Sequence, residues 1–86
     1  MNSEPLHIRI ISPTGILYEG DIHHATFPGK LGNFSVYPMH APVISALKKG
    51  AVICYQTAGH KRSIDIQSGF MELKNNLITV CVEEQV

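Results

Sequence analysis

Charge of one sign is what this sequence most clearly lacks. Its 86 residues contain 7 lysines and arginines and 7 aspartates and glutamates, so the formal net charge is 0. Proteins that bind nucleic acid concentrate positive charge opposite the phosphate backbone. A chain with this charge balance predicts no nucleic-acid partner.

Long apolar runs and a leader pattern are absent as well. No apolar stretch approaches the roughly 20 residues that a membrane-spanning helix needs. The chain starts with MNSEP, which lacks the basic and apolar regions of a signal peptide. We therefore expect a soluble protein without direct membrane insertion. The length corresponds to one domain, so residues 1–86 are predicted to form a single unit.

Cysteine is scarce. The chain has 2 cysteines, Cys54 and Cys81, and each lies in an apolar run rather than in a CxxC pair. That placement is typical of small buried side chains, and we expect both thiols to be reduced. A disulfide between neighbouring strands is the alternative, because the sequence does not fix the distance between the two Cβ atoms.

What the sequence does contain is apolar residues at every second position, which predicts strands. Residues 6–10, LHIRI, alternate apolar and polar side chains, and SPTG at 12–15 predicts a turn. The next stretch is divided at residues 20–21 into a short strand and a longer one that ends before Pro28. Residues 41–50 predict a strand or an irregular edge, because β-branched side chains disfavour a helix there.

Two hairpins are expected in the second half of the chain. Strands at 51–57 and 63–67 flank a turn at 58–60, and Asn75 and Asn76 form the tip of the last hairpin. Asparagine tolerates positive φ better than most residues, which suits a tight turn of two residues. Several short strands separated by turns, without a helix of three turns, predict an all-β sandwich or barrel.

Histidine is the only residue type frequent enough to raise the question of a metal site, with 5 in all. His23 and His24 are neighbours in a predicted strand, where successive side chains point to opposite faces, so they are not expected to share a metal ion. His7 and His60 lie in another strand and in a turn, and no ligand spacing links them. We predict no metal site and interpret these histidines as surface residues.

Patterns for catalysis are weak. Ser45 and Cys54 are candidate nucleophiles, but neither lies in a nucleophile-elbow sequence. The P-loop pattern is absent around Lys30, and the acidic residues form no recognisable pair of general acid and base. The sequence therefore predicts no enzyme and no cofactor.

The segment GNFSVYPMHAPVISALKKG, residues 32–50, raises the question whether His40 does chemistry or holds a shape. The sequence supplies His40 with no nucleophile, metal partner or orienting acid. Phe34 and Tyr37 lie in the same segment and are expected either to pack in the core or to serve a docking surface. An enzyme built on His40 is the weakest of the functions considered.

Three segments, in this order, resemble a known family. They are SPTGILYEG, FPGKLGNFSVYPMHAPVISALKKG and IDIQSGFMELKNNLITVCVE. The most specific element is Pro38-x-His40-Ala41-Pro42 followed by Leu47-x-x-Gly50, and Ser68-Gly69-Phe70 adds support. Over residues 6–83 the chain resembles the N-terminal β-sandwich of the epsilon subunit of F-type ATP synthase.

The resemblance implies a small two-sheet antiparallel β-sandwich and a non-catalytic role in the central stalk. In that family the epsilon subunit binds the gamma subunit, contacts the polar loops of the c-ring and turns with both. It thereby helps to couple ion translocation to ATP synthesis. The resemblance also implies a peripheral position in the complex, at the cytoplasmic face of the bacterial inner membrane. It assigns partner contacts to Gly32, His40, Ala41 and Pro42.

Several positions depart from the family pattern. Leu31 and Asn33 stand where acidic residues are common, which puts an acid-based contact with the c-ring in doubt. Ser35 and Met39 stand where glycine is common, and side chains there are expected to alter the backbone angles of this segment.

Many family members continue into a C-terminal pair of helices that can bind ATP or inhibit hydrolysis. If these 86 residues are the whole product, no helical hairpin and no inhibition of that kind are expected. The alternative function is a small β-sandwich that binds a peptide or a soluble ligand along an exposed edge. That function requires a deep apolar pocket with convergent polar groups.

Overall fold

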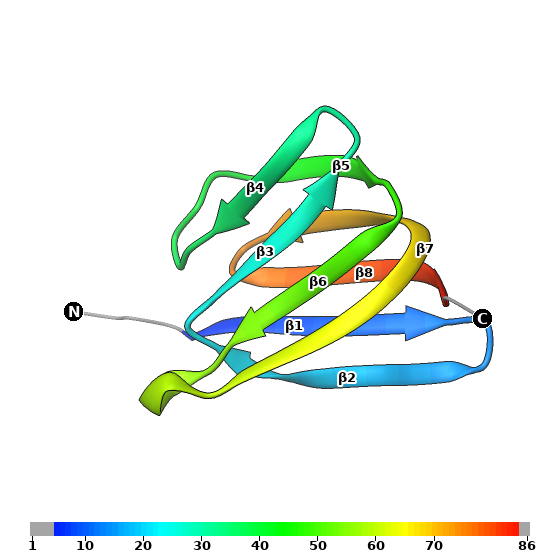
Figure 1. The fold of residues 1–86 in the computed structure, drawn as a ribbon. Coiled ribbons are helices and arrows are strands. Elements are labelled where there is room, and N and C mark those ends of the chain that lie inside the picture. Colours follow the sequence, from blue (N-terminus) through cyan, green and yellow to red (C-terminus); the bar gives the residue numbers. More distant parts are fainter. Residues whose placement is uncertain (1–4, 85–86) are drawn as a thin grey trace.

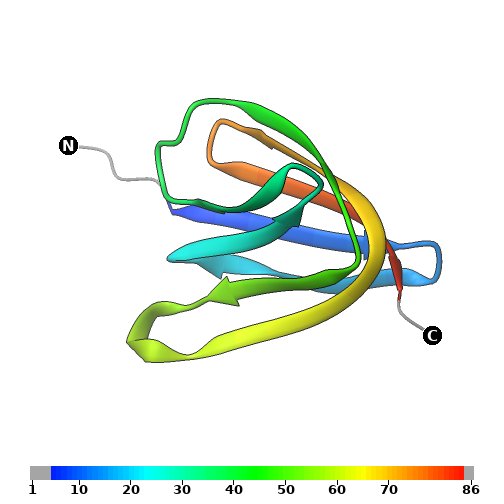
Figure 2. The same cartoon turned by 45° about the horizontal axis from the view of Figure 1, so that its top comes forward.

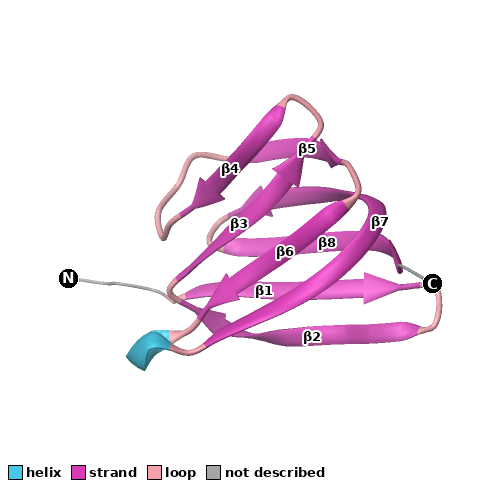
Figure 3. Ribbon diagram, viewed as in Figure 1, coloured by secondary structure: helices cyan, strands magenta, loops and turns pink. Residues whose placement is uncertain are grey.

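Strands make up nearly all of the chain in the computed structural model, which describes residues 5–84 except for the side chain of Ala58. Figures 1 and 3 show the strands, which are β1 (Leu6–Ser12), β2 (Gly15–Ile22), β3 (His24–Gly29), β4 (Gly32–Val36), β5 (Val43–Leu47), β6 (Gly50–Tyr55), β7 (Lys61–Lys74) and β8 (Leu77–Glu84). A 3₁₀ turn, η1 (Thr57–Gly59), joins β6 to β7. Among the described residues no helix is long and apolar enough to cross a membrane.

The strands form a sandwich of two crossed layers. Hydrogen bonds order them β2-β1-β8-β7-β5-β3-β4, and β6 pairs with both β3 and β7. One layer contains β1, β2, β5, β8 and the second half of β7, and the other contains β3, β4, β6 and the first half of β7. In Figure 1, β3, β4 and β6 run diagonally across the direction of β1, β2 and β8.

The long strand β7 belongs to both layers. Its first part, Lys61 to Ile66, pairs with β6, and its second part pairs with β5 and β8. The register with β8 shifts between Ile66 and Ser68. Such a bulge bends a strand and increases its twist, and Figure 2 shows β7 curving around one side of the molecule, from yellow to orange.

Gly69 follows this bulge, and β8 approaches it closely. A Cβ atom at Gly69 would lie 2.6 Å from the carbonyl oxygen of Cys81 and 3.2 Å from the Cα atom of Val82. Real side chains do not come so near to backbone atoms, so only glycine lets β8 pair with β7 at this point. The Ser-Gly-Phe element of the sequence therefore serves the passage of β7 between the layers.

The core lies between the two layers and is formed by alternate side chains of each strand. In β1 the fully buried Leu6, Ile8 and Ile10 alternate with more exposed neighbours. Phe27 of β3 is buried and stacks on the half-buried Phe34 of β4, with the ring centroids 5.4 Å apart. The buried apolar residues form one cluster, so both layers share a single core.

The structure confirms the all-β fold and most of the predicted turns. SPTG turns between β1 and β2, and β6 and β7 form the expected hairpin. Asn75 and Asn76 form the tip between β7 and β8 with φ values of 52° and 60°. Positive φ at both central residues is the signature of a type I′ turn, which matches the right-handed twist of a hairpin.

Other details differ from the sequence prediction. The first and last strands, β1 and β8, pair in parallel, which the long chain between them allows. Gly20 and Asp21 pair regularly with β1, and the break comes at His23 instead. The following strand continues through Pro28, which pairs with Asn33 of β4.

The two cysteines lie in different environments, and both are free. Cys54 is buried, as its apolar neighbours predict, and burial raises the pKa of its thiol to about 11. Cys81 is exposed, because it points outward from β8 between the buried Val80 and Val82. The expectation that Cys81 is buried is therefore wrong, because inward and outward positions alternate in β8 although its residues 80–82 are all apolar.

Candidate functional site

The residues assigned to partner contacts lie at opposite ends of β4. Gly32 begins the strand, whereas His40, Ala41 and Pro42 lie in the connection from β4 to β5. The strand itself separates the two ends by about 13 Å, at about 3.3 Å per residue. The structure therefore brings three of the four residues together and leaves Gly32 apart, in the turn at the top of Figure 1. We call residues 37–42 the His40 loop.

The His40 loop opens with a tight turn. The N–H of His40 donates to the carbonyl oxygen of Tyr37 at 3.3 Å, with Pro38 and Met39 between them. Met39 has φ 67°, in the left-handed region. Proline followed by a residue with positive φ is characteristic of a type II turn, in which glycine is favoured at the second position. A methionine there costs about 1 kcal/mol or more.

The loop exposes its side chains. Tyr37 is 50% exposed and Met39 is 74% exposed, and His40, Ala41 and Pro42 are exposed as well. Large exposed side chains on a rigid loop are suited to bury area against a partner. Such a loop binds a partner best when other parts of the protein hold it in one conformation, and two sets of contacts do so here.

A stack of three rings fixes the start of the loop. The ring of Tyr37 stacks on His24 of β3 with the centroids 4.6 Å apart, and His24 stacks on Tyr55 of β6 at 4.3 Å. Burial lowers the pKa of His24, and the neighbouring His23 lowers it further. The neutral imidazole therefore predominates at neutral pH, and the loop is attached to the layer of β3 and β6.

The expectation that His23 and His24 point to opposite faces is wrong. Their Nδ1 atoms lie 2.8 Å apart, and the rings meet edge to face. The reason is that His23 occupies the bend between β2 and β3, where the alternation of a strand does not apply. Within residues 5–84, no group of three or more metal-ligating side chains converges at this or any other point.

Asn76 fixes the middle of the loop. Its Oδ1 atom accepts a hydrogen bond of 2.7 Å from the N–H of Met39, and its Nδ2 atom lies 3.4 Å from the Met39 sulfur. Asn76 is 8% exposed, and it is the one buried polar side chain among the described residues. The loop is thereby attached to the β7–β8 turn as well.

Sequence reasoning identified Asn76 as a turn residue and missed its contact with the loop. The two residues are separated by 37 positions, and no periodicity connects a turn to a distant loop. The sequence carries no signal for this contact, because asparagine and glycine both suit the tip of a type I′ turn and the turn alone therefore explains a second asparagine.

The ring of His40 is oriented by its own loop. Its Nδ1 atom lies 2.6 Å from the carbonyl oxygen of Ala41. A carbonyl oxygen can only accept, so Nδ1 carries the hydrogen and donates. In the neutral ring, Nε2 is then an acceptor on the exposed side of the loop. The arrangement suits a donor on a binding partner rather than proton transfer to an adjacent nucleophile.

The turn that contains Gly32 has a different character. Leu31 at its tip is fully exposed, and Gly32 has φ 136°, a value that side chains rarely adopt. Asn33 follows in β4 and is exposed. Ser35 lies further along the strand and pairs with Thr26, so its side chain has not disturbed an extended backbone. Of the two positions where glycine is common in the family that the sequence resembles, only Met39 has a left-handed backbone.

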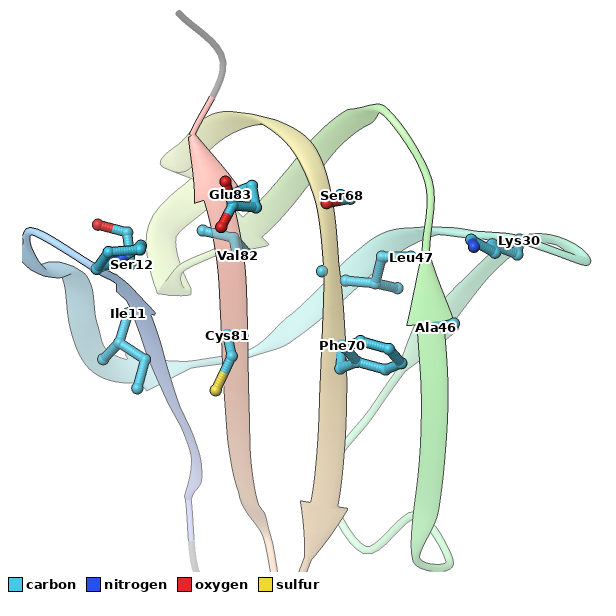
Figure 4. A pocket seen from close by; sticks show the side chains of 12 residues that line it. Ile11, Ser12, Lys30, Ala46, Leu47, Ser68, Phe70, Cys81, Val82 and Glu83 are labelled. Carbon is cyan, nitrogen blue, oxygen red and sulfur yellow. The ribbon is translucent and has the colours of Figure 1, made fainter.

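An open groove of about 470 Å³ runs over the outer face of β1, β8, β7 and β5. Its floor is a row of outward side chains at matching register positions, namely Ile11, Cys81, Phe70 and Ala46. Figure 4 shows the polar Ser12 and Lys30 at opposite sides of the groove. Glu83 and Ser68 lie between them, but the groove is open along the face of the sheet and is not the deep pocket that the ligand-binding alternative requires.

The candidate nucleophiles have no catalytic surroundings. The Ser45 hydroxyl donates to the carbonyl oxygen of Ala46 at 3.2 Å, and the Cys54 thiol is buried and protonated. His7 does meet acids, since its ring nitrogens lie 2.8 Å from Asp21 and 3.1 Å from Glu19. The cluster lies on the β1–β2 hairpin and contains no nucleophile.

Comparison with known proteins gives one consistent result. Residues 5–86 match the family described as ATP synthase, delta/epsilon chain, beta-sandwich domain. The ATP synthase epsilon chain of a Nitratiruptor species is 37% identical over 83 residues, which are 96% of this chain and 64% of that relative. The epsilon chain of a Sulfurovum species is 29% identical over 83 residues, covering 96% and 65%. The chain therefore spans less than two thirds of the length of these relatives.

Solved structures agree on the fold. A chain in the cryo-EM structure of the Euglena gracilis mitochondrial ATP synthase, with OSCP, F1 and c-ring, superposes with a TM-score of 0.87 at 15% identity, covering 100% of this chain and 54% of that one. A chain in the central stalk and c-ring of the Tetrahymena thermophila mitochondrial ATP synthase has a TM-score of 0.81 at 11% identity, covering 98% and 67%.

Proposed function

Because this chain belongs to the family of the ATP synthase delta and epsilon chain β-sandwich domain, we propose that it is a non-catalytic central-stalk subunit of F-type ATP synthase. In this role it binds the gamma subunit and the polar loops of the c-ring and couples ion translocation to ATP synthesis. The observation that carries the proposal is the family match over residues 5–86, which includes the whole His40 loop.

The fold supports a mechanical role. Two layers around one core resist compression, because protein interiors are packed as densely as organic crystals. The His40 loop is attached to both layers, through the Tyr37 stack and through Asn76. A force applied to the loop is therefore transmitted to the whole sandwich. The subunit works at the cytoplasmic face of the bacterial inner membrane, as a peripheral part of the complex.

The partner contacts belong to His40, Ala41 and Pro42 on one side and to the turn of Gly32 on the other. His40 presents Nε2 as an acceptor, and Ala41 and Pro42 offer a small apolar surface. Gly32 and the exposed Leu31 lie at the other end of β4. Since no acid flanks Gly32, the contact of this turn with the c-ring does not depend on a carboxylate, and the turn instead presents Leu31 and the exposed Lys30.

Binding of purified gamma subunit tests the proposal. We expect the wild-type chain to hold gamma on an affinity resin and His40→Ala to weaken the binding by about tenfold, the loss expected if His40 is one of the few side chains that carry most of the binding energy. Ala41→Phe is expected to weaken binding further by steric overlap. His60→Ala is the matched control, because it removes an exposed histidine from the β6–β7 connection. Failure of wild-type chain and gamma to associate at micromolar concentration would refute the proposed function.

A further inference from the structure

Asn76 lies at the meeting point of the His40 loop and the β7–β8 turn. Figures 1 and 2 both show this turn beside the connection from β4 to β5. The side-chain oxygen and nitrogen of Asn76 both contact Met39, at 2.7 Å from its N–H nitrogen and 3.4 Å from its sulfur. We propose that Asn76 is the positioning residue of the His40 loop, which holds the Met39 turn in its left-handed conformation and thereby fixes the ring of His40 for its partner.

The backbone of Asn76 is a firm support. Its φ of 60° belongs to the type I′ turn, and its carbonyl oxygen accepts the N–H of His7 at 2.9 Å. Three strands, β1, β7 and β8, therefore hold the residue, and its side chain is buried. Moving Asn76 away from the loop would require these strands to part.

Met39 is the residue that needs support. In a type II turn the N–H of the second central residue takes no part in the turn's own hydrogen bond, which here joins His40 to Tyr37. Asn76 accepts that remaining N–H. The hydrogen bond holds Met39 in a backbone conformation that a side chain disfavours. Because His40 is the next residue, the position of Met39 determines where the imidazole lies.

The Tyr37 stack cannot do this alone. It fixes Tyr37, the first residue of the turn, whereas His40 is the last residue of the turn and Ala41 and Pro42 follow it. Without Asn76, Pro38 and Met39 are free to adopt a different turn, and the ring of His40 moves with them. The inference about binding rests on the proposed function, but the inference about the loop does not.

Three variants separate the side chain from the turn. Asn76→Gly removes the side-chain contacts with Met39 and keeps the positive φ that the turn requires. Asn76→Asp keeps the acceptor for the Met39 N–H. Asn75→Gly is the control, because Asn75 occupies the same turn with φ 52° and is exposed.

Amide hydrogen exchange at Met39, measured by NMR on the whole chain, reads the contact directly. We expect Asn76→Gly to accelerate exchange at Met39 by about fivefold or more, the equivalent of one net hydrogen bond. Asn76→Asp and Asn75→Gly should leave it within about twofold of wild type. Unchanged exchange at Met39 in Asn76→Gly, or equal acceleration in Asn75→Gly, would overturn the inference.

Affinity for gamma gives the functional readout. Asn76→Gly should weaken binding by about fivefold, and this loss should shrink in a Met39→Gly background, because glycine adopts positive φ without support. If Asn76→Gly weakens binding by the same factor in the Met39→Gly background as in the wild type, Asn76 does not act through Met39 and the inference is contradicted. If gamma binds none of the chains while Met39 still loses protection in Asn76→Gly, the loop support stands and the proposed function fails.

Discussion

His7 is held between two acidic side chains of the neighbouring strand. Its Nδ1 atom lies 2.8 Å from Asp21 Oδ1 and its Nε2 atom lies 3.1 Å from Glu19 Oε2. Both nitrogens donate at once only when the ring is protonated. The hydrogen bond to Asp21 is the main cause of the raised pKa of His7, and the bond to Glu19 adds to it. Arg9 lies 3.8 Å from Glu19 and extends this exposed cluster.

The cluster predicts a pH-dependent contribution to stability. A raised pKa means that the folded chain binds the proton more tightly, so the stabilisation is complete below the ordinary value of 6.5 and is lost as the pH rises through the raised pKa. We expect His7→Gln to lower the free energy of unfolding by about 0.2–1 kcal/mol at a pH of about 5.5, as for exposed ion pairs. The effect should fade in alkaline solution.

Urea denaturation of the wild type and of His7→Gln at several pH values measures the difference in their free energies of unfolding. His24 contributes with the opposite sign because its pKa is lowered, so the comparison with the variant isolates His7. His60→Gln serves as the control, since the described part of the chain shows no carboxylate paired with His60. A stability difference that grows as the pH rises would contradict the account of His7.

At the scale of the strand, Gly69 decides whether β7 can pass between the layers. Gly69→Ala is expected to lower the free energy of unfolding by about 1–3 kcal/mol, because the new methyl group meets backbone atoms that cannot move aside. Gly20→Ala is the matched control in β2. Its Cβ would meet the Tyr18 hydroxyl at 3.5 Å, an ordinary contact, so a change within about 0.5 kcal/mol is expected. Equal effects of the two substitutions in thermal unfolding would refute the role of Gly69.

Turns and alternating strands were predictable from the sequence because their signals are local. Pro13 and Gly15 mark the first hairpin, and Asn75 and Asn76 mark the last. The passage of β7 between the layers was missed although residues 61–74 do change their pattern: inward side chains occupy even positions at Ile64 and Ile66 and odd positions at Met71 and Leu73. The split at 20–21 was wrong because pairing with β1 keeps Gly20 in the strand, although glycine is a weak strand former.

The candidate site was predictable only in part. The resemblance drew attention to the segment around His40, and the exposure of Tyr37 agrees with the suggested docking surface. Two contacts depend on the tertiary fold alone. The stack of Tyr37 on His24 joins the end of β4 to β3 and β6, and the hydrogen bond from Met39 to Asn76 spans 37 positions. A single sequence carries no signal for either.

At the scale of the whole molecule, the central claim is that the His40 loop is where this sandwich meets the central stalk and c-ring. A photoreactive amino acid incorporated at position 41 in the assembled ATP synthase tests it most directly. Thr57, exposed on the 3₁₀ turn η1, provides the control position. We predict that irradiation joins position 41 to gamma or to a c subunit and that position 57 yields neither product. Cross-links from position 57 alone, or none to these subunits from position 41, would contradict the claim.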